Sequence, residues 1–172
     1  AAWFGEEKGL LGARHYAEHP VFPLKDTVAN LNFEHMGRTD DVEGAQVGRI
    51  TASGFDYTTL GALLTEAGQA TGVEAWKHER NSDSFFARSD NQAFADKGVP
   101  AITLAVAWIF PDYHRPGDHW DKLDYGNMAR VARTCAVAVS RVAETAGPPQ
   151  WIPAGDRNAR YIEAWKALQG RP

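Results

Sequence analysis

Short apolar segments alternate with longer segments of helical periodicity along this chain, and this alternation limits its fold more than any other feature. Residues 101–105 have the composition of a buried strand, whereas residues 58–71 carry apolar side chains at the i, i+3 and i+4 spacing of a helix. Further strands are expected at residues 1–4, 27–33, 46–52 and 74–78, and further helices at residues 10–19, 91–96, 127–146 and 157–168. The alternation predicts an α/β fold, a three-layer sandwich in which helices flank a mostly parallel, mixed central sheet.

Length and composition agree with a catalytic domain. The chain has 172 residues, the usual length of one domain with its own core. Its net charge of −4 and its lack of lysine and arginine clusters argue against nucleic acid as a partner. The single cysteine, Cys135, lies in an apolar helical pattern, so we expect a buried core thiol. No apolar run is long enough to span a bilayer.

Charged side chains that suit a metal site occur at three places in the sequence. Glu6 and Glu7 follow the apolar residues 1–4, and Glu34 follows the expected strand 27–33. His114 lies in the segment Asp112-Tyr113-His114-Arg115-Pro116-Gly117-Asp118. Open α/β sheets bind their ligands at the carboxyl ends of strands, so the first two places are expected at such an edge. Carboxylates and imidazoles are also the ligands that zinc takes in catalytic sites.

Four motifs in order carry a resemblance to a known family. They are Gly5-Glu6-Glu7-Lys8-Gly9-Leu10-Leu11-Gly12, Asn32 to Gly37, Ser89-Asp90 with Gly98-Val99-Pro100-Ala101, and Asp112 to Asp118 with Asp121-Lys122. Together they resemble the zinc-dependent exopeptidases of the aminopeptidase S and glutamate carboxypeptidase type. The resemblance covers residues 5 to about 128 and implies a peptide substrate, two zinc ions and a periplasmic or secreted location.

The resemblance also implies a role for each site residue. Glu6 matches the general base and acid, and Glu7 and His114 match ligands of the first zinc. Glu34 matches the position of a ligand of the second zinc, which is usually aspartate. Three more residues are expected to contact the substrate or to orient the ligands: Tyr113 beside the scissile carbonyl, Asp118 as a partner of His114, and Asp90.

Two ligands of the implied di-zinc site have no counterpart in this chain. The family places a histidine in a His-x-Asp stretch and a bridging aspartate upstream of the Glu-Glu pair, and this chain begins just before that pair. We therefore interpret residues 1–172 as a single, partial catalytic domain, the back part of a longer peptidase. We expect the strand at residues 1–4 to leave an exposed sheet edge through which the chain can associate.

Other functions stay open at this point. The chain could be a non-catalytic fragment that acts as a binding or assembly module, or a single-zinc enzyme like the glutaminyl cyclases of the same fold group. His15-Tyr16-Ala17-Glu18-His19 also matches the inverted zinc motif His-x-x-Glu-His, although Pro20 ends its helix at once. His35, His78 and His119 are expected to be surface or supporting groups rather than ligands.

Overall fold

A computed structural model describes residues 1–170 and has a four-stranded central sheet. The strands lie in the order β1 (Asn30–Phe33), β6 (Ala101–Ala105), β4 (Arg49–Ala52) and β5 (Glu74–Trp76). β1 is parallel to β6, and β4 is antiparallel to β6 and parallel to β5, so the sheet is mixed. All five residues of β6 are buried, which is why the strand is apolar on both faces except at Thr103, whose hydroxyl is hydrogen-bonded.

The remaining elements are helices and one small hairpin. The helices are α1 (Leu11–Glu18), α2 (Leu60–Thr71), α3 (Asn81–Ser84), α4 (Asn91–Ala95), α5 (Tyr125–Glu144) and α6 (Ala159–Leu168). Short 3-10 turns are η1 (Glu6–Lys8), η2 (Leu24–Asp26), η3 (Phe86–Arg88) and η4 (Trp120–Lys122), and the hairpin pairs β2 (Asp40–Asp41) with β3 (Gly44–Ala45). None of the helices within residues 1–170 is long and apolar enough to cross a membrane.

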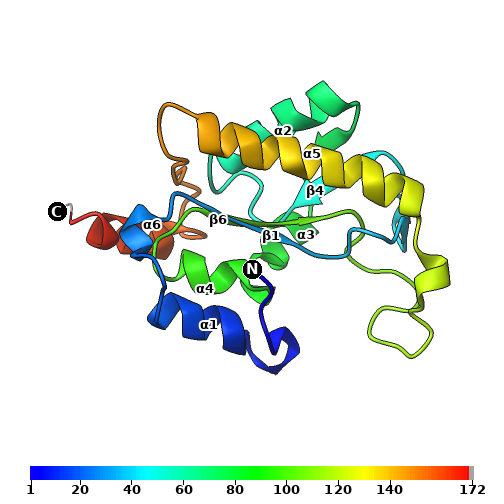
Figure 1. The fold of residues 1–172 in the computed structure, drawn as a ribbon, viewed down its shortest axis with the longest axis horizontal. Helices are drawn as coiled ribbons and strands as arrows, with labels where there is room; N and C mark the ends of the chain where they lie inside the picture. The colour runs from blue at the N-terminus through cyan, green and yellow to red at the C-terminus, as the bar shows by residue number, and fades with distance from the viewer. Residues whose placement is uncertain (171–172) are drawn as a thin grey trace.

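Helices α2 and α5 pack against each other over one face of the sheet (Figure 1). The apolar core between these helices and the sheet includes Leu60, Leu64, Val131, Ile102 and Leu104. Cys135 of α5 belongs to the same core, and its burial raises the pKa of the thiol to about 12. The prediction of a buried core cysteine is therefore confirmed.

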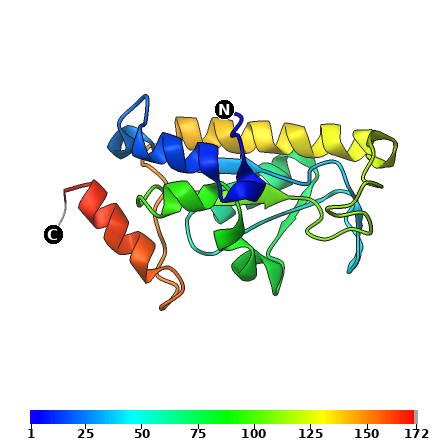
Figure 2. The ribbon, with the colours of Figure 1, turned by 90° about the horizontal axis from the view of Figure 1, so that it is seen from below.

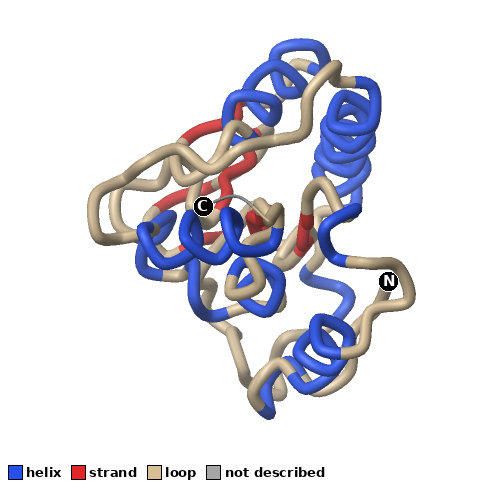
Figure 3. Tube along the Cα trace, turned by 90° about the vertical axis from the view of Figure 1, so that its left-hand side faces the viewer, coloured by secondary structure: helices blue, strands red, loops and turns tan. Residues whose placement is uncertain are grey.

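Helices α1, α4 and α6 cover the other face (Figure 2), so the sheet lies between two helical layers, as the end view shows (Figure 3). The second core holds Phe94 of α4, Trp3 and Tyr16, whose rings lie 5.0 to 5.9 Å apart. α6 packs directly over Gly98, which has φ of 90°, and a Cβ there would lie 2.4 Å from the backbone nitrogen of Trp165. Glycine is therefore required before β6.

The strand expected at residues 1–4 is wrong. Gly5 has φ of 72° and turns the chain, and Phe4 is 80% exposed instead of packing into the sheet. The carbonyl of Phe4 accepts a hydrogen bond from the Gly12 amide at 2.8 Å, so this segment is tied to α1. The outer strand on this side is β1, which has no strand beyond it within the described residues. The other expected strands and helices are present, with ends shifted by a few residues.

Candidate active site

The Glu-Glu pair lies on η1, a single turn between the amino terminus and α1. Gly5 and Gly9 on either side of the turn have φ of 72° and 98°, so the backbone reverses sharply at both ends. Glu6 is partly buried, whereas the side chain of Glu7 is 66% exposed. The pair therefore sits on a turn rather than at the end of a strand, and the turn presents both carboxylates to one cavity.

The segment from Asp112 to Asp118 brings His114 to Glu7. The Nε2 atom of His114 lies 2.6 Å from the Oε1 atom of Glu7. The Tyr113 ring stacks on the imidazole at 4.0 Å between centroids, and His114 itself has a left-handed φ of 56°. The two residues assigned to one zinc thus meet in space, although more than a hundred positions separate them in the sequence.

Glu34 extends from the carboxyl end of β1 and is held by uncharged groups. The hydroxyl of Ser89 donates a short hydrogen bond to its Oε1 atom. Asn32 donates to Ser89 at 2.7 Å and to Thr103 of β6 at 3.2 Å, and Thr103 donates to Asn91 at 2.8 Å. This chain of hydrogen bonds crosses the sheet from α4 to Glu34 and fixes the orientation of its carboxylate.

A cavity of about 790 Å³ connects these groups. Four carboxylates line it, from Glu6, Glu7, Glu34 and Asp90, together with the rings of Phe85, Trp108 and Tyr113. Burial, followed by the charges of Glu34, Glu7 and Asp90, raises the pKa of Glu6 to about 7. A carboxyl that titrates near neutral pH can take up a proton and return it, as a general base and acid must.

Asp118 does not hydrogen-bond to His114; instead it binds Arg38. The guanidinium of Arg38 is 3% exposed and binds Asp40 through two nitrogens at 2.8 and 2.6 Å. It also binds Asp118 at 2.7 Å and Asp112 at 3.3 Å, and it lies 4.6 Å from the centre of the Phe110 ring. Hydrogen bonds and charge from Lys122 and Arg38 lower the pKa of Asp112. Arg38 therefore fastens both ends of the segment that carries His114.

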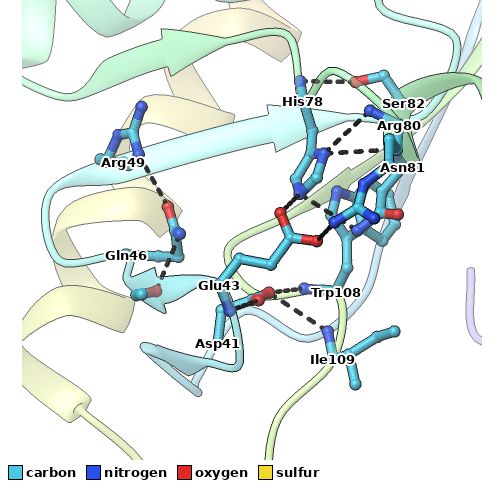
Figure 4. A network of polar contacts seen from close by, with 11 residues as sticks. Asp41, Glu43, Gln46, Arg49, His78, Arg80, Asn81, Ser82, Trp108 and Ile109 are labelled. Atoms are coloured by element: carbon cyan, nitrogen blue, oxygen red, sulfur yellow. Dashed lines mark hydrogen bonds and ion pairs between the residues drawn. The ribbon is translucent and has the colours of Figure 1, made fainter.

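Asp41 fixes the apolar wall of the cavity (Figure 4). Its Oδ2 atom accepts hydrogen bonds from the backbone amides of Trp108 at 2.7 Å and Ile109 at 3.3 Å. Trp108 in turn packs on Phe85, with 5.0 Å between the ring centroids. Neither Arg38 nor Asp41 was singled out in the sequence. The position of Arg38 directly after Gly37 of a recognised motif was the only feature of the sequence that pointed to it. No feature of the sequence pointed to Asp41.

The side chains expected to bind zinc are of a suitable kind but are few. Glu7 and His114 supply the oxygen and nitrogen donors that zinc prefers. Within residues 1–170, however, no three His, Cys, Asp or Glu side chains converge closely enough to hold a metal ion. The rings of His15 and His19 in the inverted motif lie 4.9 Å apart on the exposed side of α1, and neither lines the cavity.

Comparisons with known proteins identify the family of this chain. The model of peptidase family M28 matches residues 1–139. A curated relative, the probable lipoprotein aminopeptidase LpqL of Mycobacterium tuberculosis (strain ATCC 25618 / H37Rv), is 25% identical over 188 aligned positions, which cover 95% of this chain and 38% of the relative.

Solved aminopeptidases share the fold. One from Aneurinibacillus sp. strain AM-1 is 24% identical with a TM-score of 0.63, covering 88% of this chain and 34% of that one. The zinc aminopeptidase BSAP of Bacillus subtilis is 19% identical with a TM-score of 0.65, covering 91% and 36%. This chain thus spans little more than a third of the length of these relatives. Its family match, over most of its length, shows that the chain belongs to peptidase family M28.

Proposed function

We propose that this chain supplies part of the active site of an aminopeptidase, which releases N-terminal residues from peptides. The observation that carries this proposal is the 2.6 Å contact between Glu7 and His114 beside the partly buried Glu6. Burial raises the pKa of Glu6 to about 7, and a carboxyl with a strongly raised pKa in a cleft is a candidate catalytic group. The aminopeptidases among the relatives support the choice over a glutaminyl cyclase or a non-catalytic module.

Each side chain has a proposed role. Glu7 and His114 would hold one zinc ion and Glu34 a second, with the remaining ligands supplied by another part of the longer protein. Zinc, when bound, supplies Lewis-acid chemistry that eases the removal of a proton from water. Glu6 accepts that proton and returns it to the amine that leaves.

Tyr113 is proposed to donate a hydrogen bond to the scissile carbonyl. Burial is the main cause that raises its pKa, so the phenol keeps its proton at neutral pH. Its ring is also fixed against His114 and His35, so the hydroxyl has a defined position. A fixed donor beside the carbonyl oxygen stabilises the charge that develops there during attack.

An exported location is part of the proposal. The relative from Mycobacterium tuberculosis is named as a lipoprotein, which supports export for this protein as well. Periplasmic fractionation of cells that carry an epitope-tagged gene product would test it, and a cytoplasmic signal alone would contradict it.

Replacement of Glu6 tests the catalytic assignment. In the longest gene product that contains this chain, Glu6→Gln should abolish hydrolysis of L-leucine p-nitroanilide while zinc per chain, measured by elemental analysis, stays unchanged. Glu18→Gln in the inverted motif is the matched control and should keep full activity. The reverse result, with Glu18→Gln inactive and Glu6→Gln active, would place the catalytic centre on α1 instead.

A further inference from the structure

Glu43 lies in the turn between β2 and β3 and binds a buried histidine (Figure 4). Its Oε2 atom lies 3.1 Å from the Nε2 atom of His78, which is 4% exposed, and its Oε1 atom accepts a short hydrogen bond from Arg80. Asp41 of the same hairpin binds the backbone amide of Trp108 at 2.7 Å. Glu43 and His78 do not line the cavity, whereas Trp108 does. The hairpin is thus tied both to the cavity wall and to the segment that follows β5.

The imidazole of His78 joins this hairpin to α3 through its two nitrogens. Its Nδ1 atom accepts hydrogen bonds from the backbone amides of Arg80 at 3.3 Å and Asn81 at 3.2 Å, where α3 begins. Because those amides can only donate, Nδ1 carries no proton, and the ring proton is on Nε2, which donates to Glu43. In return, the hydroxyl of Ser82 accepts a hydrogen bond from the backbone amide of His78 at 3.0 Å. The start of α3 is therefore fixed relative to the hairpin.

Helix α3 in turn holds one ring of the apolar wall. Phe85 directly follows α3 and lines the cavity, and its backbone amide donates to the carbonyl of Asn81 at 3.0 Å. The Phe85 ring packs on Trp108, with 5.0 Å between the ring centroids. One hairpin thus holds both rings, Trp108 through Asp41 and Phe85 through Glu43 and His78.

This contact is complete within the described chain. His78 follows β5, which is at the opposite edge of the sheet from β1. Both ring nitrogens of His78 and both carboxylate oxygens of Glu43 have partners among residues 1–170, so no group from elsewhere in the longer protein is needed. A buried polar network whose members are all hydrogen-bonded holds its neighbours in one arrangement. The position of Phe85 is therefore set from outside the cavity.

We propose that Glu43 and His78 are positioning residues that set the side-chain selectivity of the site by holding Phe85 beside Trp108. This inference rests on the proposed aminopeptidase function and concerns how sharply that site distinguishes one N-terminal side chain from another. An apolar wall distinguishes side chains by size only while its rings are fixed, because a wall that can move adjusts to each of them. Without the contact between Glu43 and His78, Phe85 can move away from Trp108 and selectivity falls.

Two variants that break this contact in different places test the proposal. Glu43→Ala removes the carboxylate from the hairpin. His78→Asn keeps an oxygen that can accept the amide hydrogen bonds at the start of α3, since asparagine is a good capping residue, but its side chain is too short to reach Glu43. Both variants act on residues outside the cavity, so the contact is lost while the side chains that line the cavity are unchanged.

The kinetic constants are measured for L-leucine and L-alanine p-nitroanilides with the zinc-loaded, longest gene product. An apolar pocket separates side chains that differ by one methylene by about 10-fold to 200-fold, so we expect the kcat/KM preference between the two substrates to fall by about 10-fold in both variants. The fall should come from KM for the leucine substrate, with kcat for the alanine substrate unchanged. Glu43→Gln keeps an oxygen that accepts from His78 and should restore the preference.

The control variant is Glu66→Ala, which removes a surface partner of Arg141 and should keep the preference. An unchanged preference in Glu43→Ala and His78→Asn overturns the proposal. An equal loss of activity toward both substrates also overturns it, because the two residues would then support the fold without acting on selectivity.

Fluorine NMR of protein labelled with 5-fluorotryptophan gives a readout that needs no hydrolysis. Trp76 lies 5.0 Å from the ring of His78 and reports the local change, Trp108 reports the wall, and Trp120, which is 74% exposed on η4, is the control. We expect His78→Asn to shift the signals of Trp76 and Trp108 but not that of Trp120; a shift at Trp76 alone refutes the proposal. If wild type hydrolyses neither substrate, the proposed function fails, and the Trp108 signal still decides whether His78 holds the wall.

Discussion

Replacing Arg38 by methionine should destabilise the protein more than the loss of any surface ion pair would. Arg38 is 3% exposed, and its removal leaves Asp40, Asp112 and Asp118 facing one another without their shared cation. Breaking a buried ion pair from one side costs about 3 to 5 kcal/mol. The three aspartates are 24% to 51% exposed and can be partly rehydrated, so we expect a loss of about 2 to 4 kcal/mol.

Urea unfolding followed by circular dichroism measures this loss. With a slope of about 2 kcal/mol per molar, the midpoint of Arg38→Met should fall by about 1 to 2 M. Arg141→Met is the matched control, since Arg141 binds Glu66 at the surface and exposed pairs contribute less than about 1 kcal/mol. The reasoning is refuted if the two variants lose equal stability. Zinc affinity should also fall in Arg38→Met, because the segment that carries His114 is no longer fastened.

Three further predictions follow from the packing and the charges. In the metal-free chain, burial disfavours the ionised form of Glu6. The stability that protonated Glu6 contributes to the fold is therefore fully present below its ordinary pKa of 4.5 and is lost as the pH rises through about 7. Glu6→Gln should therefore raise the melting temperature at pH 8 more than at pH 5, and an equal change at both would contradict the raised pKa. Leu104→Ala in β6 should lower the free energy of unfolding, measured by urea denaturation, by about 2 to 5 kcal/mol, because the residue is fully buried. Asp41→Asn should raise KM for substrates with large apolar side chains more than it lowers kcat, because it loosens Trp108. An unchanged KM would show that Asp41 does not hold this wall of the cavity in place.

The layers of the fold could be predicted from sequence because burial leaves a local pattern. The mostly apolar composition of β6 and the periodic spacing of α2 follow directly from where their side chains pack. The order of the strands could not be predicted, because nothing within β4 shows that it runs antiparallel to β6. Residues 1–4 were misread for a related reason: an apolar run becomes a strand only beside another strand, and here Trp3 packs on Tyr16 instead.

The site divides in the same way. The meeting of Glu7 and His114 was anticipated only through the family resemblance, since no local pattern links two segments so far apart. Asp118 was expected to contact His114, but Arg38 competes for it with a full charge in a buried position. The role of Arg38 depends on how three loops come together, and residue spacing in the sequence does not predict that arrangement.

Mutations outside the cavity can also disturb the site. A chain of hydrogen bonds runs from Asn91 through Thr103, Asn32 and Ser89 to Glu34. Asn91 is fully buried beneath the sheet and does not line the cavity, yet its loss would free the far end of this relay. We therefore expect inactivating alleles to extend below the sheet, at positions that a survey of cavity-lining residues alone would class as neutral.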